Sequence, residues 1–443
     1  MAPSTNSIRT GCGSPVGTQV HVLSFEGPDG YAQAGGIASR VSGLTQALAD
    51  AGFDTHLWFI GDPQLPGRES RHGLTLHRWC QWISGYHPGG VYDGEEGKRR
   101  DYAQSLPPYL TRELLVPYLS GPDRHAVILA EEWQTVDAVL HLDWLLRQAG
   151  LRDRVTILWN ANNTFSFERI SWTQLACAAV ITTVSRYMRQ LMLPLGVEPL
   201  VIPNGLSADA LRPPDRAAVT EFRSRLRGRF VLAKVARWDP DKRWMLAVQT
   251  VAELKRHGWC PLLVARGGCE AHGAEVLGTA VAAGLKVVER NGSYGGLQGL
   301  LHGVDNADGA DIISLRVPLD CEARCVLFRG AAAVLANSGH EPFGLVGLET
   351  MAAGGVACTG CSGEDYVIPG QNALVLATTD PREFVSLYQD LRGNRPRTCA
   401  IRQAGQMTAR RYAWPAIVEH NLLPRIRLLA DAGGGTVPPS TRH

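Results

Sequence analysis

The sequence predicts an α/β protein with two Rossmann-like domains, and three observations support this expectation. The 443 residues are too many for one ordinary core and suit two domains of about 200 residues each. Apolar runs of strand length alternate with amphipathic segments of helix length, in two successive series. Turn formers at 203–205 separate the series. We therefore expect an N-terminal domain at 18–202 and a C-terminal domain at 203–412.

The first series opens with a strand, a glycine-rich loop, a helix and a second strand. We expect the strand over 19–24, the loop over 26–36, the helix over 37–51 and the next strand over 56–60. Apolar residues three or four positions apart, which fall on one helical face, indicate the helix. Residues 61–125 show little periodicity, and we expect loops and short elements there.

The remaining elements follow the same alternation. The first series should continue with strands at 126–130, 155–159, 180–184 and 200–202, and with helices at 136–148 and 186–193. The second should contain strands at 230–236 and 261–265, a helix at 243–257, and further elements at 274–290 and 311–315. A helix at 413–432 is expected to cross back to the first domain, and the tails at 1–17 and 433–443 to be disordered. Because parallel sheets bind ligands at the carboxyl ends of their strands, we expect the site in a cleft between the domains.

The composition argues against several classes of protein. A net charge of +2 offers no electrostatic footprint for nucleic acid. No run approaches about 18 apolar residues, so we expect no integral membrane segment. The N-terminus has no apolar leader, which favours a cytoplasmic location. The preference for arginine over lysine favours a bacterial source, and the oligomeric state stays open.

The ten cysteines are scattered and do not suggest a disulfide framework. Cys358 and Cys361 are spaced as C-x-x-C, and Cys321 and Cys325 lie four apart on an expected helix. No His or Cys pair with zinc-ligand spacing lies near them in the sequence. We therefore expect neither a metal nor a cofactor.

A strand, a turn and a helix are expected around residue 340. The apolar run 331–336 has strand length, turn formers occupy 337–340, and a helix should begin near Phe343 or Gly344. The first amides of a helix lack intrahelical partners and carry the positive end of its dipole. A phosphate or diphosphate can bind there, so the segment predicts an anion site.

Two glutamates flank the expected anion site. Glu341 precedes the helix, and Glu349 lies about one and a half turns into it. One carboxylate can reach hydroxyls on one side of a bound diphosphate, and the second can reach those on the other side. This spacing suits a sugar nucleotide. The alternative is an amphipathic helix with two solvated glutamates.

The whole segment 338–354 resembles the signature of the retaining glycosyltransferases of family 4, which include bacterial glycogen synthases and sucrose synthases. That family has two Rossmann-like domains facing across a cleft, the GT-B fold. The resemblance implies that Glu341 contacts the donor sugar and Glu349 the nucleotide ribose. It also places three neighbouring residues at the donor: Phe343, Gly344 and Leu345.

A pair of cations follows the strand expected at 230–236. Arg237 and Lys242 resemble the R-x-x-x-x-K element of the same family, which holds the donor diphosphate. Such contacts contribute roughly 3 kcal/mol each when they strengthen in the transition state. The resemblance implies no required metal, because these cations supply the positive charge. The alternative is that both residues pair on the surface with Asp239 and Asp241, which we interpret as a turn and a helix cap.

The loop 26–36 contains Gly35 and Gly36, in a string that resembles the K-x-G-G-L loop of glycogen synthases. The absence of side chains there would let the backbone approach the donor phosphates. Gln33 stands where those enzymes have lysine, which disfavours α-glucan extension. A purely structural turn is the alternative.

Two polar segments follow expected strands of the first series. Glu131 stands where the family often has the histidine of H-D-W, beside the donor sugar, and is a catalytic candidate that could accept a hydrogen bond or orient the acceptor. Solvation of Glu131 and Glu132 as loop charges is equally open. Three amides at a strand end suit sugar hydroxyls, or else form a turn: Asn160, Asn162 and Asn163. In the second series, the resemblance places Val317 at the nucleobase, chiefly through its backbone.

Together these features predict a retaining glycosyltransferase. It would move a sugar from a nucleoside-diphosphate sugar to an acceptor that the sequence leaves unidentified. One alternative is a nucleotide-sugar epimerase or hydrolase on the same fold, for which Glu131 is the candidate acid or base. Another is a non-catalytic protein that binds sugar nucleotides.

Overall fold

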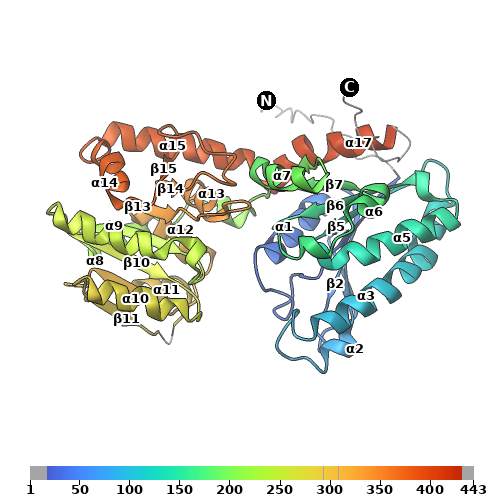
Figure 1. The fold of residues 1–443 in the computed structure, drawn as a ribbon, viewed down its shortest axis with the longest axis horizontal. Helices are drawn as coiled ribbons and strands as arrows, with labels where there is room; N and C mark the ends of the chain where they lie inside the picture. The colour runs from blue at the N-terminus through green and yellow to red at the C-terminus, as the bar shows by residue number, and fades with distance from the viewer. Residues whose placement is uncertain (1–16, 293, 308, 432–443) are drawn as a thin grey trace, which may run out of the picture. The chain divides into compact units, whose positions relative to one another are not determined.

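A computed structural model describes residues 17–292, 294–307 and 309–431, so the expected disordered tails lie almost wholly outside the described residues. The chain divides into two compact units, each with its own parallel sheet (Figure 1). Within the described residues, the first unit comprises 17–182, 194–200 and 418–431, and the second 183–193 and 201–417. The predicted α/β class with two parallel-sheet domains is confirmed.

The first sheet has the strand order β3-β4-β2-β1-β5-β6-β7-β8. Its strands are β1 (Thr18–Leu23), β2 (Asp54–Ile60), β3 (Arg68–Arg71), β4 (Leu74–Trp79), β5 (His125–Glu131), β6 (Val155–Ala161), β7 (Val180–Thr183) and β8 (Leu200–Val201). β1 pairs in parallel with β2 and β5, β2 with β4, and β5 with β6, whereas β3 runs antiparallel to β4. The order reverses between β1 and β5, which makes that position the topological switch point.

Helices cover this sheet. They are α1 (Gly36–Asp50), α2 (Gln81–Ser84), α3 (Glu95–Tyr109), α4 (Val116–Leu119), α5 (Val136–Gln148), α6 (Trp172–Ala178) and the C-terminal α17 (Leu423–Asp431). The predicted α1 is confirmed, and it buries Val41, Leu44 and Leu48. α17 contacts β6, and the π-helical turn Val418–Leu422 contacts α1, so the return of the C-terminal helix to the first unit is confirmed.

The expectation of loops and short elements over 61–125 is wrong for most of that segment. It holds β4, which lies inside the sheet, and a helical stretch that runs from α3 through a π-helical segment to α4. The periodicity is hidden because charged residues occupy buried positions: Arg78 on β4 is 5% exposed and Lys98 on α3 is 0% exposed. The Lys98 ammonium donates to the Tyr31 hydroxyl, 2.6 Å away, and to two backbone carbonyls, which compensates its burial.

The second sheet has the order β11-β12-β10-β9-β13-β14-β15, and its pairs are parallel. Its strands are β9 (Phe230–Val235), β10 (Pro261–Arg266), β11 (Val287–Arg290), β12 (Ile312–Leu315), β13 (Ala333–Ala336), β14 (Ala357–Thr359) and β15 (Leu374–Val375). Successive residues of one strand join opposite cores: Leu232 belongs to one apolar cluster, and Val231 and Ala233 to the other. Both faces are therefore covered, as in doubly wound folds. The switch point lies between β9 and β13.

The helices of this unit are α7 (Arg186–Met192), α8 (Arg216–Arg225), α9 (Trp244–Arg256), α10 (His272–Ala282), α11 (Gly296–Gly303), α12 (Cys321–Gly330), α13 (Leu345–Ala352), α14 (Pro381–Gln389), α15 (Arg395–Arg411) and α16 (Trp414–Ile417). In the part of the chain that the structure describes, no helix is long and apolar enough to cross a membrane.

Candidate functional site

Three residues predicted to contact a donor lie at the switch point of the second unit. Arg237 and Lys242 follow β9, and Glu341 follows the neighbouring strand β13. Because adjacent parallel strands end at the same edge, their loops meet where doubly wound sheets bind ligands. The structure therefore brings together the cation element and the glutamate motif, which lie about 100 residues apart.

Lys242 and Glu341 form an ion pair, with 2.8 Å between Nζ and Oε2 and each side chain 20% exposed. The two loops are also joined through Asp241, whose carbonyl accepts from the Gly339 amide at 2.7 Å and whose carboxylate accepts from the His340 amide at 2.9 Å. Asp239 caps the short turn that carries Lys242, because it accepts from the Asp241 amide at 2.8 Å. Lys242 thus pairs with the motif glutamate and not with the neighbouring aspartates.

Arg237 is exposed, and its guanidinium forms no ion pair with a carboxylate of the described residues. Its backbone is fixed, since its carbonyl accepts from the Trp244 indole N–H at 2.7 Å. Its charge helps to lower the pKa of Glu270, although the hydrogen bond from the Trp238 amide is the largest cause. A cation on a fixed backbone, without a carboxylate partner, remains available to an anion.

α13 begins at Leu345, within two residues of the predicted start. Its N-cap residue is Gly344, so no N-cap side chain accepts a hydrogen bond from the first amides of the helix. A Cβ on Gly344 would lie 2.7 Å from Cγ of Glu364, so packing requires glycine. Phe343 is 4% exposed and packs against Tyr366, with 5.9 Å between ring centroids. Phe343 thus fixes the turn, and the start of α13 lies where the sequence predicts an anion site.

Glu349 lies on α13 and is 24% exposed, with 3.7 Å between its Oε1 and Nη2 of Arg324 on α12. Burial raises the pKa of Glu349, and Arg324 opposes that shift. Arg324 was not among the predicted site residues, because nothing in its local sequence shows that α12 lies beside α13. Val317 is 1% exposed, and its carbonyl accepts from Arg266 Nε at 3.2 Å, so the structure already uses one backbone group that was expected at the base.

Two buried ionisable residues near Glu341 were also missed. Glu364 follows β14 and is 6% exposed; burial and the nearby Glu341 raise its pKa to about 7. Lys234 on β9 is 1% exposed, and burial lowers its pKa to about 7. Its ammonium donates to the Leu335 carbonyl and to Asn337 Oδ1, both at 3.0 Å. Position at a strand end could have indicated Glu364, whereas a lysine within a strand gives no such signal.

In the first unit, the amides at the start of α1 have an internal partner. The Glu26 carboxylate accepts from the amides of Gly35 at 3.0 Å and Ala38 at 2.9 Å, and the Tyr92 hydroxyl donates to its other oxygen at 2.6 Å. A Cβ at Gly35 or Gly36 would meet no atom closer than 4.0 Å. Packing therefore does not require these glycines. The Gly35 amide, which was expected to approach the donor phosphates, already donates a hydrogen bond to Glu26.

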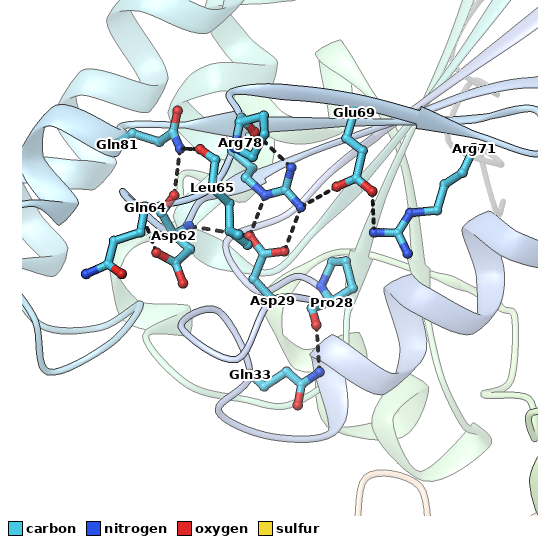
Figure 2. Close-up of polar contacts among 11 residues, drawn as sticks. Pro28, Asp29, Gln33, Asp62, Gln64, Leu65, Glu69, Arg71, Arg78 and Gln81 are labelled. Carbon is cyan, nitrogen blue, oxygen red and sulfur yellow. Dashed lines mark hydrogen bonds and ion pairs between the residues drawn. The ribbon is translucent and has the colours of Figure 1, made fainter.

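The glycine-rich loop is anchored by a buried ion pair. Figure 2 shows the Asp29 carboxylate facing the Arg78 guanidinium, with Nε–Oδ2 at 2.8 Å and Nη2–Oδ1 at 3.0 Å. Arg78 also donates to Glu69 at 2.9 Å. Gln33, which replaces the lysine of glycogen synthases, donates to the Pro28 carbonyl at 2.8 Å. The loop is thus held by the Gln33–Pro28 hydrogen bond within it and by the ion pair between Asp29 and Arg78 of β4.

Glu131 at the end of β5 is 1% exposed and is not a solvated loop charge. Both of its oxygens lie 3.0 Å from Nε of the buried Arg40. Oε2 also accepts from the side-chain Nδ2 groups of Asn160 at 2.9 Å and Asn162 at 2.8 Å. Asn163 stands apart, since its oxygen accepts from the Phe165 amide at 2.7 Å and forms a turn. The structure therefore joins Glu131 to two of the three predicted asparagines, whereas the buried Oδ1 of Asn162 accepts no hydrogen bond from the described residues.

Glu132, which was not predicted as a site residue, has a strained backbone and a carboxyl with a raised pKa. It has φ +70° and ψ 165°, a backbone conformation that strains a non-glycine residue. It is 3% exposed, and burial, more than the nearby Glu131, raises the pKa of its carboxyl to about 8. Its Oε1 accepts from the Asn162 amide at 2.6 Å. A buried carboxyl with a raised pKa at the switch point of this sheet is a further candidate site group.

Among the described residues, no group of three or more His, Cys, Asp or Glu side chains could hold a metal ion. Cys358 is buried on β14, and Cys361 is exposed and donates to the Leu376 carbonyl at 3.6 Å.

Comparison with known proteins finds similarity in fold. No protein-family model matches the chain, and no curated protein matches it. A sucrose-phosphate synthase from Thermosynechococcus elongatus is 19% identical, with a TM-score of 0.62, over 93% of this chain and 100% of that one. The catalytic domain of Arabidopsis thaliana starch synthase IV, bound to ADP and acarbose, is 13% identical with a TM-score of 0.67, over 94% and 99%.

An Anabaena protein, HepE, solved with UDP-glucose, is 14% identical with a TM-score of 0.60, over 93% of this chain and 100% of that one. Two of these neighbours were solved with a bound nucleotide or nucleotide sugar, but at such identities the likeness shows the fold alone. The chain has the α/β fold, with two parallel-sheet domains, of the GT-B glycosyltransferases.

Proposed function

We propose that the protein is a retaining glycosyltransferase that uses a nucleoside-diphosphate sugar. The observation that carries the proposal is the meeting, at one switch point, of Arg237, the Lys242–Glu341 pair and the uncapped start of α13. These groups offer positive charge for a diphosphate and, beside it, a carboxylate for sugar hydroxyls.

In the proposed reaction, the bond between the sugar anomeric carbon and the donor phosphate oxygen breaks, and a bond to the acceptor oxygen forms on the same face of the sugar. The leaving diphosphate keeps the bonding electron pair and takes the acceptor's proton. Arg237, Lys242 and the α13 amides stabilise the negative charge that grows on the leaving oxygen. Glu341 orients the sugar, and Glu349 binds the ribose.

Glu131 receives a different role from the one expected. Its carboxylate is held by Arg40, Asn160 and Asn162, so we assign it to positioning the end of β5 and not to catalysis. The neighbouring Glu132 is also buried, but its pKa is raised to about 8, which favours a protonated carboxyl able to donate a hydrogen bond at neutral pH. The acceptor stays unassigned.

A turnover assay tests the proposal. The purified protein is incubated with ADP-, UDP- and GDP-sugars, with and without a panel of sugar acceptors, and release of nucleoside diphosphate is measured. Release that depends on an acceptor supports transfer. Release with water alone would support the hydrolase alternative, and saturable binding without release would support a binding protein.

A further inference from the structure

Three arginines from three helices of the second unit gather around the C-terminal end of α12. Arg223 lies on α8, Arg329 on α12 and Arg402 on α15 (helices in Figure 1). Arg223 donates to the carbonyls of Arg329 at 2.8 Å and Gly330 at 3.3 Å. Arg402 donates through Nη2 to the carbonyl of Ala331, 3.4 Å away. Two guanidinium groups therefore contact the carbonyls of three consecutive residues, 329–331.

Arg329 extends this arginine cluster to the end of a second helix. Its Nη1 donates to the carbonyl of Gly354, which lies just beyond α13. A Cβ built on Gly354 would lie 3.2 Å from the same nitrogen. The cluster thus contacts the C-terminal ends of both α12 and α13.

The cluster has more positive charge than its surroundings neutralise. No carboxylate of the described residues forms an ion pair with Arg223, Arg329 or Arg402. Each helix C-terminus supplies about −0.5 of an elementary charge, so two supply about −1 against +3. A surplus of about two positive charges remains.

Two of these arginines, Arg402 and Arg223, have lowered pKa values, first from burial and then from mutual repulsion. Burial, followed by repulsion from Arg329 and Arg223, lowers the pKa of Arg402 to about 10. Burial and repulsion from Arg329 also lower the pKa of Arg223. In addition, Nε of Arg402 is buried and donates no hydrogen bond. The cluster therefore has both uncompensated charge and an unused donor.

We propose that Arg223, Arg329 and Arg402 form a binding site for a small dianion of the phosphate class, separate from the proposed donor site. Guanidinium groups suit phosphate because their planar donors match its oxygens and because arginine stays charged. The ligand is either inorganic phosphate or the phosphoryl group of a metabolite. The helix carbonyls offset only about one of the three positive charges. A bound anion would neutralise the charge that remains on the arginine cluster.

The donor site must be silenced before this site is tested, because phosphate would also bind Arg237 and Lys242. The experiment uses full-length protein carrying Arg237→Ala and Lys242→Ala. Inorganic phosphate is titrated at constant ionic strength, with chloride as the balancing anion, and the melting temperature is followed. We expect a saturable rise, since a ligand that binds the folded state stabilises it by mass action.

Single substitutions then locate the bound anion. Arg402→Gln and Arg223→Gln should each weaken phosphate binding about tenfold or more, from the loss of a charged hydrogen bond. Arg402→Lys should retain part of the affinity. The matched control is Arg382→Gln, because Arg382 is an exposed arginine that pairs with Asp380 at 2.6 Å, and it should change nothing.

A second arm separates the two sources of phosphate. A sugar monophosphate that binds more tightly than inorganic phosphate identifies a metabolite site, and equal affinities identify a site for the free ion. No saturable rise with either ligand, or the same rise in Arg402→Lys, Arg223→Gln and the parent protein, would overturn the proposal. Arg223 is exposed, so Arg223→Gln should fold. Its phosphate affinity can be measured even if Arg402→Gln does not fold.

Discussion

Lys242 and Glu341 lie 99 positions apart in the chain, yet their side chains form a 2.8 Å ion pair between the loops that follow β9 and β13. The pair places one positive and one negative charge at the switch point of the second sheet. A diphosphate would contact the ammonium, and the sugar hydroxyls the carboxylate. The predictions for the donor site start from this pair.

Lys242→Ala should mainly lower turnover. The ammonium stabilises charge that develops on the leaving diphosphate, so its loss should reduce kcat about 100-fold, equivalent to about 3 kcal/mol. The measurement is steady-state kinetics with saturating donor. Lys255→Ala is the matched control, because Lys255 pairs with Asp311 on the same unit and should keep wild-type kcat. A Lys242→Ala enzyme with unchanged kcat would remove Lys242 from the chemistry.

Glu349→Ala should mainly weaken donor binding, because Glu349 is expected to accept hydrogen bonds from the ribose. Burial raises the pKa of Glu349, so the carboxylate protonates at a higher pH than an exposed glutamate. Donor affinity should therefore fall as pH decreases toward that raised pKa, and Glu349→Gln should lack this dependence. Calorimetric titration with the donor across pH 5 to 8 measures this pH dependence. The range lies above the ordinary pKa of glutamate, about 4.3. Identical pH profiles for both proteins would contradict the assignment.

Glu131→Ala should destabilise the first unit by about 3–5 kcal/mol, because it leaves the buried Arg40 without its carboxylate. Glu131→Gln should be milder, since an amide oxygen still accepts hydrogen bonds. Asp209→Ala is the control: Asp209 and Arg212 form an exposed pair, for which about 0–1 kcal/mol is expected. Chemical denaturation measures the differences. A fully stable Glu131→Ala protein with reduced kcat would restore the catalytic role first expected.

Stability should depend on pH through the buried histidines of the first sheet. His21 and His77 lie beside His56, and burial lowers the pKa of His21 and brings that of His77 to about 3. Between pH 6.5 and 3 the unfolded chain binds a proton at His77 that the folded protein does not, and the lowered pKa of His21 acts in the same direction, so stability falls as pH decreases. Each such histidine contributes about 1.4 kcal/mol per pH unit.

His77→Gln should therefore flatten the fall in melting temperature below pH 6.5. His302→Gln is the control, because His302 is 62% exposed. Thermal unfolding of the three proteins at a series of pH values gives the comparison. Equal slopes for wild type and His77→Gln would mean that His77 is already protonated in the folded protein.

Much of the proposed donor site could be predicted from local sequence. The strand, turn and helix at 331–352 are signalled within a few residues of one another, because apolar runs and turn formers act locally. The same reasoning placed Arg237 and Lys242 at a strand end. The pairing of Lys242 with Glu341 depends on which strands are neighbours, and no local pattern gives that order.

The missed features share one physical cause: polar groups buried by partners that are distant in sequence. Arg78 hides the character of β4 because Asp29 compensates its charge from 49 positions away. Glu131 resembles an exposed loop residue until Arg40, 91 positions away, is placed beside it. Glu26 accepts a hydrogen bond from the amide of Gly35, where the backbone was expected to approach phosphate, and only the folded loop shows this.

The most direct test of the central claim is the melting temperature of wild type, Lys242→Ala, Arg237→Ala and Lys255→Ala with UDP, ADP and GDP. At a ligand concentration of 100 times Kd, binding adds about 2.7 kcal/mol to the folded state. We predict that at least one nucleotide raises the melting temperature of wild type and Lys255→Ala, and raises it much less in the other two variants. No rise with any nucleotide, or an equal rise in all four proteins, would contradict a donor site at Arg237 and Lys242.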